Sequence, residues 1–225
     1  MRVKSNLDAI IYDRIISALI MGEYQMGQVI SLDDLSTKYE VSRTPVTQAV
    51  RLLTNDGILE MQKNGRVKVP EMTEEDLKKI CEVRLLLEEF AVKRTFLVMD
   101  QLGKEYFDNL EQLADKGIKA IRNQDVLGFN KLDMEFHKGL ISGVHNVYLE
   151  EEYKEIQGKF LVANYLLYPI NGRDFTGAAE DHVKIVDAIK EKNINACLGL
   201  IRKHVYPFRI EYSDDMLVEK FHYIK

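Results

Sequence analysis

The segment Val41–Leu53, with the sequence VSRTPVTQAVRLL, decides how the first third of this chain folds. Ser42 is of a residue type that starts helices, because its side chain can accept a hydrogen bond from a backbone N–H of the first turn. Pro45 follows in that turn, where its missing N–H needs no partner. We therefore predict a helix from Ser42 to about Asn55, with Arg43 at its N-terminal tip.

Two further helices and a hairpin surround this segment. Apolar residues recur at spacings of three and four over residues 6–21, which predicts an amphipathic helix. SLDD, from Ser31, is a capping box that opens a short helix over residues 32–39. The β-prone runs ILEMQ and RVKVP are separated by KNG at residues 63–65, which predicts a β-hairpin. The order helix, helix, helix, hairpin is that of a winged helix-turn-helix.

The charge of the chain changes sign near residue 70. The whole chain has a net charge of −5; residues 1–70 contain nine Lys/Arg and eight Asp/Glu, whereas residues 71–225 contain 22 and 28. We therefore predict two domains, a winged helix-turn-helix over residues 1–70 and an all-helical domain over residues 71–225. The acidity argues against a general nucleic-acid coat protein. It does not exclude a DNA-reading module, because phosphate neutralisation depends on local contacts.

The second domain carries helical signals throughout. TEED, from Thr73, is another capping box and opens a long helix. Further helices are predicted over residues 101–123, 125–143, 146–168, 176–191 and 193–213, followed by a short tail helix. The predicted fold class is mainly α, a winged helix-turn-helix followed by an all-α antiparallel helical bundle. No apolar run is long enough to cross a bilayer and the N-terminus is no signal peptide, so we expect a cytoplasmic protein without a membrane partner.

The third helix is the expected recognition helix, whose N-terminal residues would face the bases. An arginine at its tip can bind guanine or clamp a phosphate, and a glutamine one turn further can read adenine. Basic residues beside the hairpin turn suit the adjacent backbone or minor groove. Singly, each residue also fits an ordinary surface helix, but the combination of cap, proline and following hairpin favours double-stranded operator DNA as the partner. The predicted DNA-binding residues are Ser42, Arg43, Thr44, Thr47, Gln48, Lys63 and Arg66.

The histidines of the second domain suggest a metal site. LDMEFHKGL places Asp133 and His137 four residues apart on one helix face, so both can point at one ion. EDHVKIVDAI supplies His182, and LIRKHVYPF supplies His204. Three imidazoles and a carboxylate suit zinc, nickel or another borderline divalent metal. Because a lone histidine is more often a solvated or core residue, the spacing alone leaves both readings open.

Residues 22–59 resemble the GntR family of bacterial transcription regulators, most specifically through VSRTPV and the DG that follows the third helix. The resemblance covers about residues 9–70 and implies a winged-helix homodimer in which Arg43 contacts DNA. The family commonly has an arginine at the position of Asp33 and an arginine followed by glutamate at the positions of Thr47 and Gln48. An aspartate repels phosphate and threonine has a shorter reach, so we expect a different operator or a lower DNA affinity.

The helical half resembles the FCD ligand-binding domain of the FadR-type GntR subgroup. DMEFH, DHVKIVDAI and RKHV match its recurrent pattern, and the likeness extends over most of residues 73–210. The resemblance implies a metal inside the bundle, held by Asp133, His137, His182 and His204. It also implies that Arg84, in EVRLLLE, lines the same cavity and binds a carboxylate effector. The alternative for Arg84 is a surface salt bridge with Glu88, four residues on.

The expected function is a homodimeric transcription regulator, not an enzyme, whose operator affinity is controlled by a small organic acid at the metal. We expect a repressor, although whether the acid releases or promotes DNA binding does not follow from the sequence. Two alternatives keep the regulator: the ion itself is the signal, or the metal is purely structural. A metal-dependent hydrolase is the alternative from another class, but we find no further acid or base with distinctive spacing and no nucleophile motif.

Overall fold

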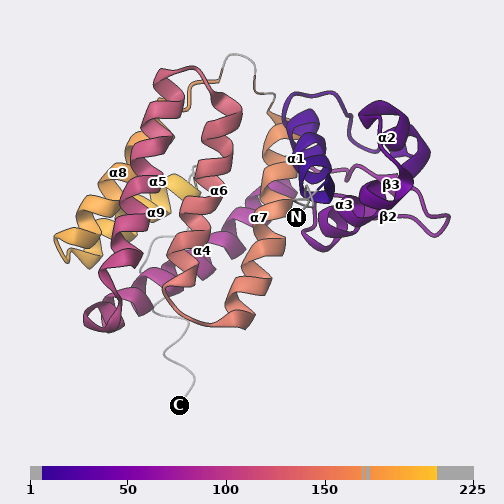
Figure 1. The fold of residues 1–225 in the computed structure, drawn as a ribbon. Coiled ribbons are helices and arrows are strands. Elements are labelled where there is room, and N and C mark those ends of the chain that lie inside the picture. Colours follow the sequence, from indigo (N-terminus) through magenta and orange to yellow (C-terminus); the bar gives the residue numbers. More distant parts are fainter. Residues whose placement is uncertain (1–6, 169, 171–172, 207–225) are drawn as a thin grey trace, which may run out of the picture.

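The computed structural model describes residues 7–168, 170 and 173–206, and its N-terminal third is a winged helix-turn-helix (Figure 1). Its helices are α1 (Leu7–Ile20), α2 (Leu32–Tyr39) and α3 (Arg43–Asn55). Its three-stranded antiparallel sheet has the order β1 (Val29–Ile30), β3 (Val67–Lys68), β2 (Glu60–Met61). In this sheet Val67 of the central strand is paired with Ile30 on one side and Met61 on the other.

The predicted helices and hairpin of this part are confirmed. The Ser31 hydroxyl accepts a hydrogen bond from the Asp34 N–H, 3.0 Å long, and the Asp34 carboxylate accepts one from the Ser31 N–H, 3.2 Å long. Gly65, in the hairpin turn, has a φ of +77°, which glycine adopts without strain. Strand β1 was not predicted from the sequence. A two-residue strand shows no period of its own, and its partner lies far away in the chain.

The C-terminal part is a helical bundle, as predicted. Its first helix begins at the predicted Thr73 capping box, and the 3₁₀ turn η1 occupies the start of the helix predicted over residues 101–123. The last helix ends at Val205; residues 207–213 of the predicted final helix, and the tail helix, lie outside the described residues. The elements are α4 (Glu74–Val98), η1 (Met99–Gln101), α5 (Lys104–Arg122), α6 (Val126–Ser142), α7 (Val147–Leu167), α8 (Thr176–Lys190) and α9 (Ile194–Val205).

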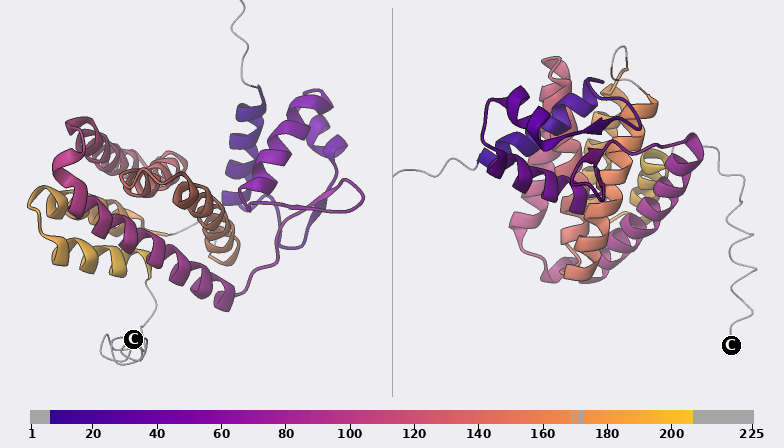
Figure 2. Two further views of the ribbon diagram at one scale, coloured as in Figure 1. Left: turned by 90° about the horizontal axis from the view of Figure 1, so that it is seen from below. Right: turned by 90° about the vertical axis from the view of Figure 1, so that its right-hand side faces the viewer.

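Helix α7 lies on the side of the bundle that faces α1 (Figures 1 and 2). Apolar side chains of both parts join one buried cluster, which includes Ile15 of α1, Leu53 of α3, and Leu161 and Val162 of α7. Burial of such side chains stabilises the contact between the two parts. Among the described helices, none combines the length and the apolar character needed to cross a membrane.

Candidate metal centre and nucleic-acid interface

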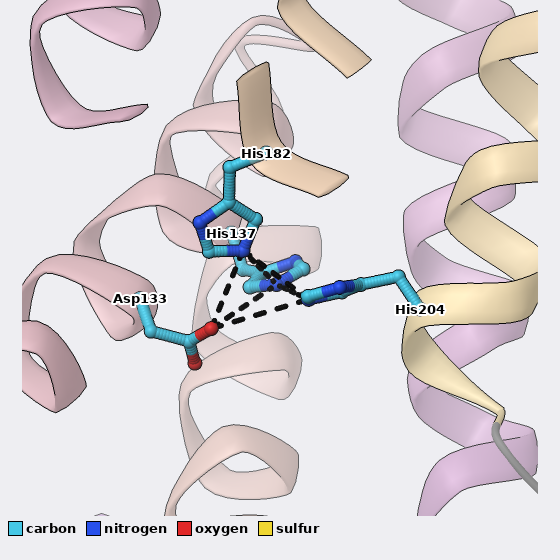
Figure 3. A group of neighbouring side chains, drawn as sticks. All are labelled: Asp133, His137, His182 and His204. Carbon is cyan, nitrogen blue, oxygen red and sulfur yellow. Dashed lines mark hydrogen bonds and ion pairs between the residues drawn. The ribbon is translucent and has the colours of Figure 1, made fainter. Parts of the chain in front are cut away.

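Four side chains from three helices point toward one another inside the bundle (Figure 3). Asp133 and His137 lie on α6, His182 on α8 and His204 on α9. The Nε2 atoms of His137 and His204 are 3.0 Å apart, those of His137 and His182 3.3 Å, and those of His182 and His204 3.2 Å. Asp133 Oδ1 lies 3.3 Å from His182 Nε2 and 3.8 Å from His137 Nε2. The structure therefore brings together all four residues predicted as metal ligands.

The spacing of these atoms fits a divalent metal. Tetrahedral zinc with Zn–N bonds of about 2.0–2.1 Å separates neighbouring donor atoms by roughly 3.3 Å. The three Nε2 pairs, at 3.0, 3.2 and 3.3 Å, match that separation. Hydrogen bonds cannot satisfy all three Nε2 pairs at once, because each Nε2 carries either an N–H or a lone pair, so at least two lone pairs or two N–H groups face each other. A cation relieves this repulsion, and the residues thus fit zinc and other borderline divalent ions.

Glu88 orients His137 and was not foreseen in this role. Its Oε2 accepts a hydrogen bond of 2.7 Å from His137 Nδ1, and its Oε1 accepts a bond of 2.7 Å from the Tyr153 hydroxyl. A carboxylate facing Nδ1 fixes the tautomer that leaves the Nε2 lone pair free for a metal. Burial raises the pKa of the fully buried Glu88, but His137 and Arg84 more than offset this and lower it to about 2.

Burial keeps His137 and His182 neutral and their lone pairs available. It lowers the pKa of His137 to about 4, although the Glu88 carboxylate opposes the shift. Burial also lowers the pKa of His182. For Asp133, burial favours the protonated form, but the hydrogen bond with His182 and the nearby His137 and Arg84 hold its pKa well below the usual range. At neutral pH His137 and His182 are therefore neutral imidazoles and Asp133 is an ionised carboxylate, the forms that bind a metal.

Arg84 combines features of both readings considered for it. Its Nε donates a hydrogen bond of 2.8 Å to Glu88 Oε1, so the salt bridge forms, but both side chains are buried rather than on the surface. The guanidinium also lies 4.2 Å from the ring centroid of Phe160. Arg84, Asp133 and His204 line a cavity of about 330 Å³, which is near the lower end for small-molecule sites. Another arginine of its wall, Arg173, was not singled out from the sequence.

Most of the predicted DNA-binding side chains lie exposed at the tip of α3 and on the hairpin. Ser42 occupies the N-cap position of α3, but its side chain forms no capping hydrogen bond, contrary to the expected cap. Thr47 is half-buried, and its hydroxyl donates a 2.8 Å bond to the Arg43 carbonyl oxygen, so that donor is used within the helix. The exposed predicted residues are Ser42, Arg43, Thr44, Gln48, Lys63 and Arg66.

An acidic residue lies beside the arginine at the tip of α3. Asp33 Oδ1, in the first turn of α2, is 3.6 Å from Arg43 Nη1, and both side chains are largely exposed. Asp33 therefore does more than add negative charge to this surface, since it offers Arg43 an intramolecular partner.

The contact between α7 and the winged helix centres on Asp56, the residue that ends α3. The buried Asp56 carboxylate accepts a 2.7 Å hydrogen bond from the Tyr12 hydroxyl and pairs with Lys154 Nζ at 2.8 Å. A Cβ added to Gly158 of α7 would overlap the Asp56 carbonyl oxygen. The preceding residue, Gln157, donates a 2.7 Å bond from Nε2 to the carbonyl oxygen of Met134, which follows Asp133 in α6.

Comparison with known proteins gives two family matches. Residues 79–206 match the FCD domain, and residues 7–69 match the family described as bacterial regulatory proteins, gntR family. The uncharacterized HTH-type transcriptional regulator YdhC of Bacillus subtilis (strain 168) is 27% identical over 194 residues, covering 86% of this chain and 85% of that protein. The gluconate operon transcriptional repressor of the same organism is 27% identical over 187 residues, covering 80% and 72%.

Solved structures show the same fold. E. coli McbR/YncC has a TM-score of 0.71 at 19% sequence identity, and the match covers 99% of this chain and 100% of that one. At that identity the likeness concerns the arrangement of the helices and not the ligand.

Proposed function

The chain belongs to the gntR family of bacterial regulatory proteins that carry an FCD domain, and on this premise we propose that a small organic acid, bound beside a divalent metal, sets its operator affinity. The family and the named relatives are transcription regulators, so the chain is a DNA-binding regulator and not the hydrolase considered as an alternative. We further propose that it acts as a repressor in the cytoplasm, as the name of the gluconate operon relative suggests.

The observation that carries the acid-sensing proposal is a cluster of four donors, two of which, Asp133 and His204, line a small cavity. Asp133, His137, His182 and His204 would hold the ion, and Arg84 adds a positive charge to the cavity beside them. A bound divalent ion with open coordination positions attracts a carboxylate. The volume of about 330 Å³ suits a small acid rather than a long-chain ligand.

On the DNA side, the proposed contacts are the exposed residues at the tip of α3 and on the hairpin. The N-terminus of α3 also favours a phosphate, because the first N–H groups of a helix have no partner within the helix. Arg43 is the proposed base contact, with Lys63 and Arg66 on the flanking backbone. We keep the proposed domain boundary at residue 70, because one family match ends at residue 69 and the other begins at residue 79.

Asp33 is expected to weaken this DNA contact. In the Asp33→Asn variant, Arg43 loses its competing partner and the surface loses a negative charge. We expect the affinity for a selected operator duplex to rise several-fold at low salt, on the order of 1 kcal/mol, with a steeper salt dependence because Arg43 is freed to displace a counterion. Fluorescence anisotropy over a salt series measures both quantities. Asp115→Asn removes the same charge from the exposed surface of α5, and an equal gain there would argue against a local effect.

A route from the cavity to the DNA-binding domain runs through α7. Asp133 is followed by Met134, whose carbonyl oxygen accepts the Gln157 hydrogen bond, and Gly158 then packs on Asp56 at the end of α3. A shift of α6 when acid binds would therefore change the packing of α7 on the winged helix. The acid needs only a few kcal/mol of differential affinity between the two arrangements to change operator occupancy.

We propose that the exposed face of α4 joins two copies of the chain. Val83, Leu86, Phe90 and Leu97 are 42%, 69%, 50% and 75% exposed and recur at spacings of three, four and seven. Apolar residues at these spacings form the stripe through which two helices pack against each other. A second copy is the occupant that suits the function, because a winged helix reads one half-site and a pair reads two half-sites about one DNA turn apart.

The dimer proposal predicts that Leu86→Glu makes the protein monomeric. In the dimer, the introduced glutamate of each copy would be buried without a cationic partner and would face the same glutamate of the other copy. Size-exclusion chromatography with light scattering measures the mass, and operator affinity is expected to fall at least tenfold as the two half-sites are no longer bound together. Leu86→Met keeps this face of α4 apolar, so we expect that variant to stay dimeric. A dimer that survives Leu86→Glu would rule out this face.

The whole proposal is tested in one series of measurements. Operator duplexes are first selected from a random pool by the full-length protein loaded with zinc or nickel. Affinity is then measured with metal removed, with metal alone, and with metal plus small organic acids. We expect a change of tenfold or more only when acid is added to the metal-loaded protein. A change with metal alone would make the ion the signal, and loss of thermal stability on chelation without any effect on the acid response would make the metal structural.

A further inference from the structure

The cavity beside the metal cluster contains a second arginine whose charge is not met by a carboxylate. Arg173 Nη1 donates hydrogen bonds of 3.1 and 3.5 Å to the carbonyl oxygens of Tyr168 and Asn164, and Nη2 donates one of 3.2 Å to Asn164 Oδ1. All these acceptors are neutral. Among residues 7–168, 170 and 173–206, no carboxylate lies within ion-pair distance of Arg173.

Arg84 differs in this respect. Its positive charge is balanced by the buried Glu88 carboxylate, whose Oε1 lies 2.8 Å from Arg84 Nε. Its guanidinium is also packed against Phe160. Arg173 lies over the rings of Phe175 and Tyr165, at 4.9 and 5.5 Å from the centroids, and these contacts hold the guanidinium in place without neutralising it. A guanidinium has five N–H donors, so the three bonds to described residues leave donors for a further acceptor.

The two arginines contact different parts of the cavity wall that α7 forms. Helix α7 lines the cavity with Gln157, Phe160, Leu161, Asn164 and Tyr165, and Tyr168, the residue that follows the helix, lines it as well. Arg84 packs on Phe160, whereas Arg173 is held by Asn164 and Tyr168, four and eight residues further along. At 1.5 Å per residue, those anchor points lie about 6 to 12 Å beyond Phe160 along the helix axis. Arg84 and Arg173 therefore reach the cavity wall at different turns of α7, and Arg84 is linked to the metal cluster through Glu88, which is also hydrogen-bonded to His137.

We infer that the acid sensed by this protein carries two anionic groups. One is held by Arg84 and the metal cluster of Asp133, His137, His182 and His204, and the other is held by Arg173. This inference rests on the proposed function and narrows it to a short dicarboxylate or a phosphorylated small acid. A guanidinium binds either group through two parallel N–H···O bonds. Arg173 then distinguishes such acids from monocarboxylates of the same length, because a neutral end would leave its charge facing an apolar or amide group.

The test uses the full-length, metal-loaded protein and isothermal titration calorimetry. Succinate, glutarate and adipate are each compared with the monoamide of the same acid, and 3-phosphoglycerate is compared with glycerate. We expect at least one dianion to bind ten times more tightly than its matched monoanion, and the better series identifies the second group as carboxylate or phosphate. Dianions and monoanions that bind equally well would overturn the inference while leaving the proposed function intact. If no acid binds although the metal is present, the proposed function fails as well.

Variants add an independent readout. Arg173→Gln is expected to weaken the preferred dianion at least tenfold and its monoanion less than twofold, with unchanged metal content. Arg122→Gln removes the same charge from the exposed end of α5 and should change neither. Equal weakening of both ligands by Arg173→Gln would show that this arginine maintains the cavity rather than binding the second anionic group. The comparison of ligands on the native protein remains valid even if the variant folds poorly.

Discussion

The variant with both His182 and His204 replaced by alanine is expected to lose its divalent metal. Two of the four donors disappear, and the remaining pair, Asp133 and His137, lies on a single helix. Structural zinc sites with four ligands are worth roughly 10–16 kcal/mol, so removing two ligands costs on the order of 5 kcal/mol, about a thousandfold or more in affinity. Elemental analysis of the purified protein and competition with a chelating dye measure the loss.

The control for this variant is His145→Asn. His145 is exposed, lies outside the cluster, and has a φ of +52°, a conformation that asparagine tolerates. It should keep full metal content and an unchanged acid response. If the double variant also keeps its metal, the ligand assignment is wrong. If it loses the metal but still responds to the acid, the ion has no part in sensing.

Much of the fold could be predicted because helix ends and turns are encoded by neighbouring residues. The capping boxes at Ser31 and Thr73 and the caps Asp125 and Asn146 each depend on groups no more than three residues away, and all four form in the structure. Strand β1 could not be found this way, because it is defined by its pairing with β3, a segment distant in the chain. The start of α5 was placed too early, because the 3₁₀ turn η1 continues the helical pattern past α4.

The candidate metal site was predictable where its residues share a helix face or a family pattern. Asp133 and His137 are four residues apart, and the resemblance assigned the candidate histidines His182 and His204 to the same ion. Glu88 was foreseen only as a partner of Arg84, because its contact with His137 joins two helices that are distant in the chain. Its position four residues after Arg84 was visible, but the burial that makes it an orienting carboxylate was not.

Gly158 carried a signal that we did not use. A glycine within a long predicted helix costs about 1 kcal/mol relative to alanine, so its presence at residue 158 suggested a close backbone approach. The structure supplies the reason, since the Asp56 carbonyl oxygen occupies the space that a Cβ would need. Which segment makes that approach depends on how α7 packs on the winged helix, and no local pattern encodes this.

Gly158→Ala is therefore expected to destabilise the protein although alanine is the better helix former. Helix propensity alone predicts a gain of up to about 1 kcal/mol. The added methyl group, however, meets backbone rather than a flexible side chain, and overpacking of this kind typically costs about 1–3 kcal/mol. To relieve the overlap, α7 must move away from Asp56, which strains the bonds from Tyr12 and Lys154. Chemical denaturation measures the stability, and operator affinity with and without acid measures the coupling.

Gly199→Ala is the matched control, since Gly199 lies inside α9 and a Cβ there meets no atom within 4 Å. It should be neutral or slightly stabilising and leave the acid response unchanged. We expect Gly158→Ala to bind metal and acid as the parent protein does, yet to show a clearly smaller change in operator affinity when acid is added. That combination would show that the variant uncouples effector binding in the helical domain from DNA binding by the winged helix, because the acid still binds while its effect on operator affinity is reduced. A Gly158→Ala variant as stable as Gly199→Ala and with full coupling would mean that the signal reaches the winged helix by another route.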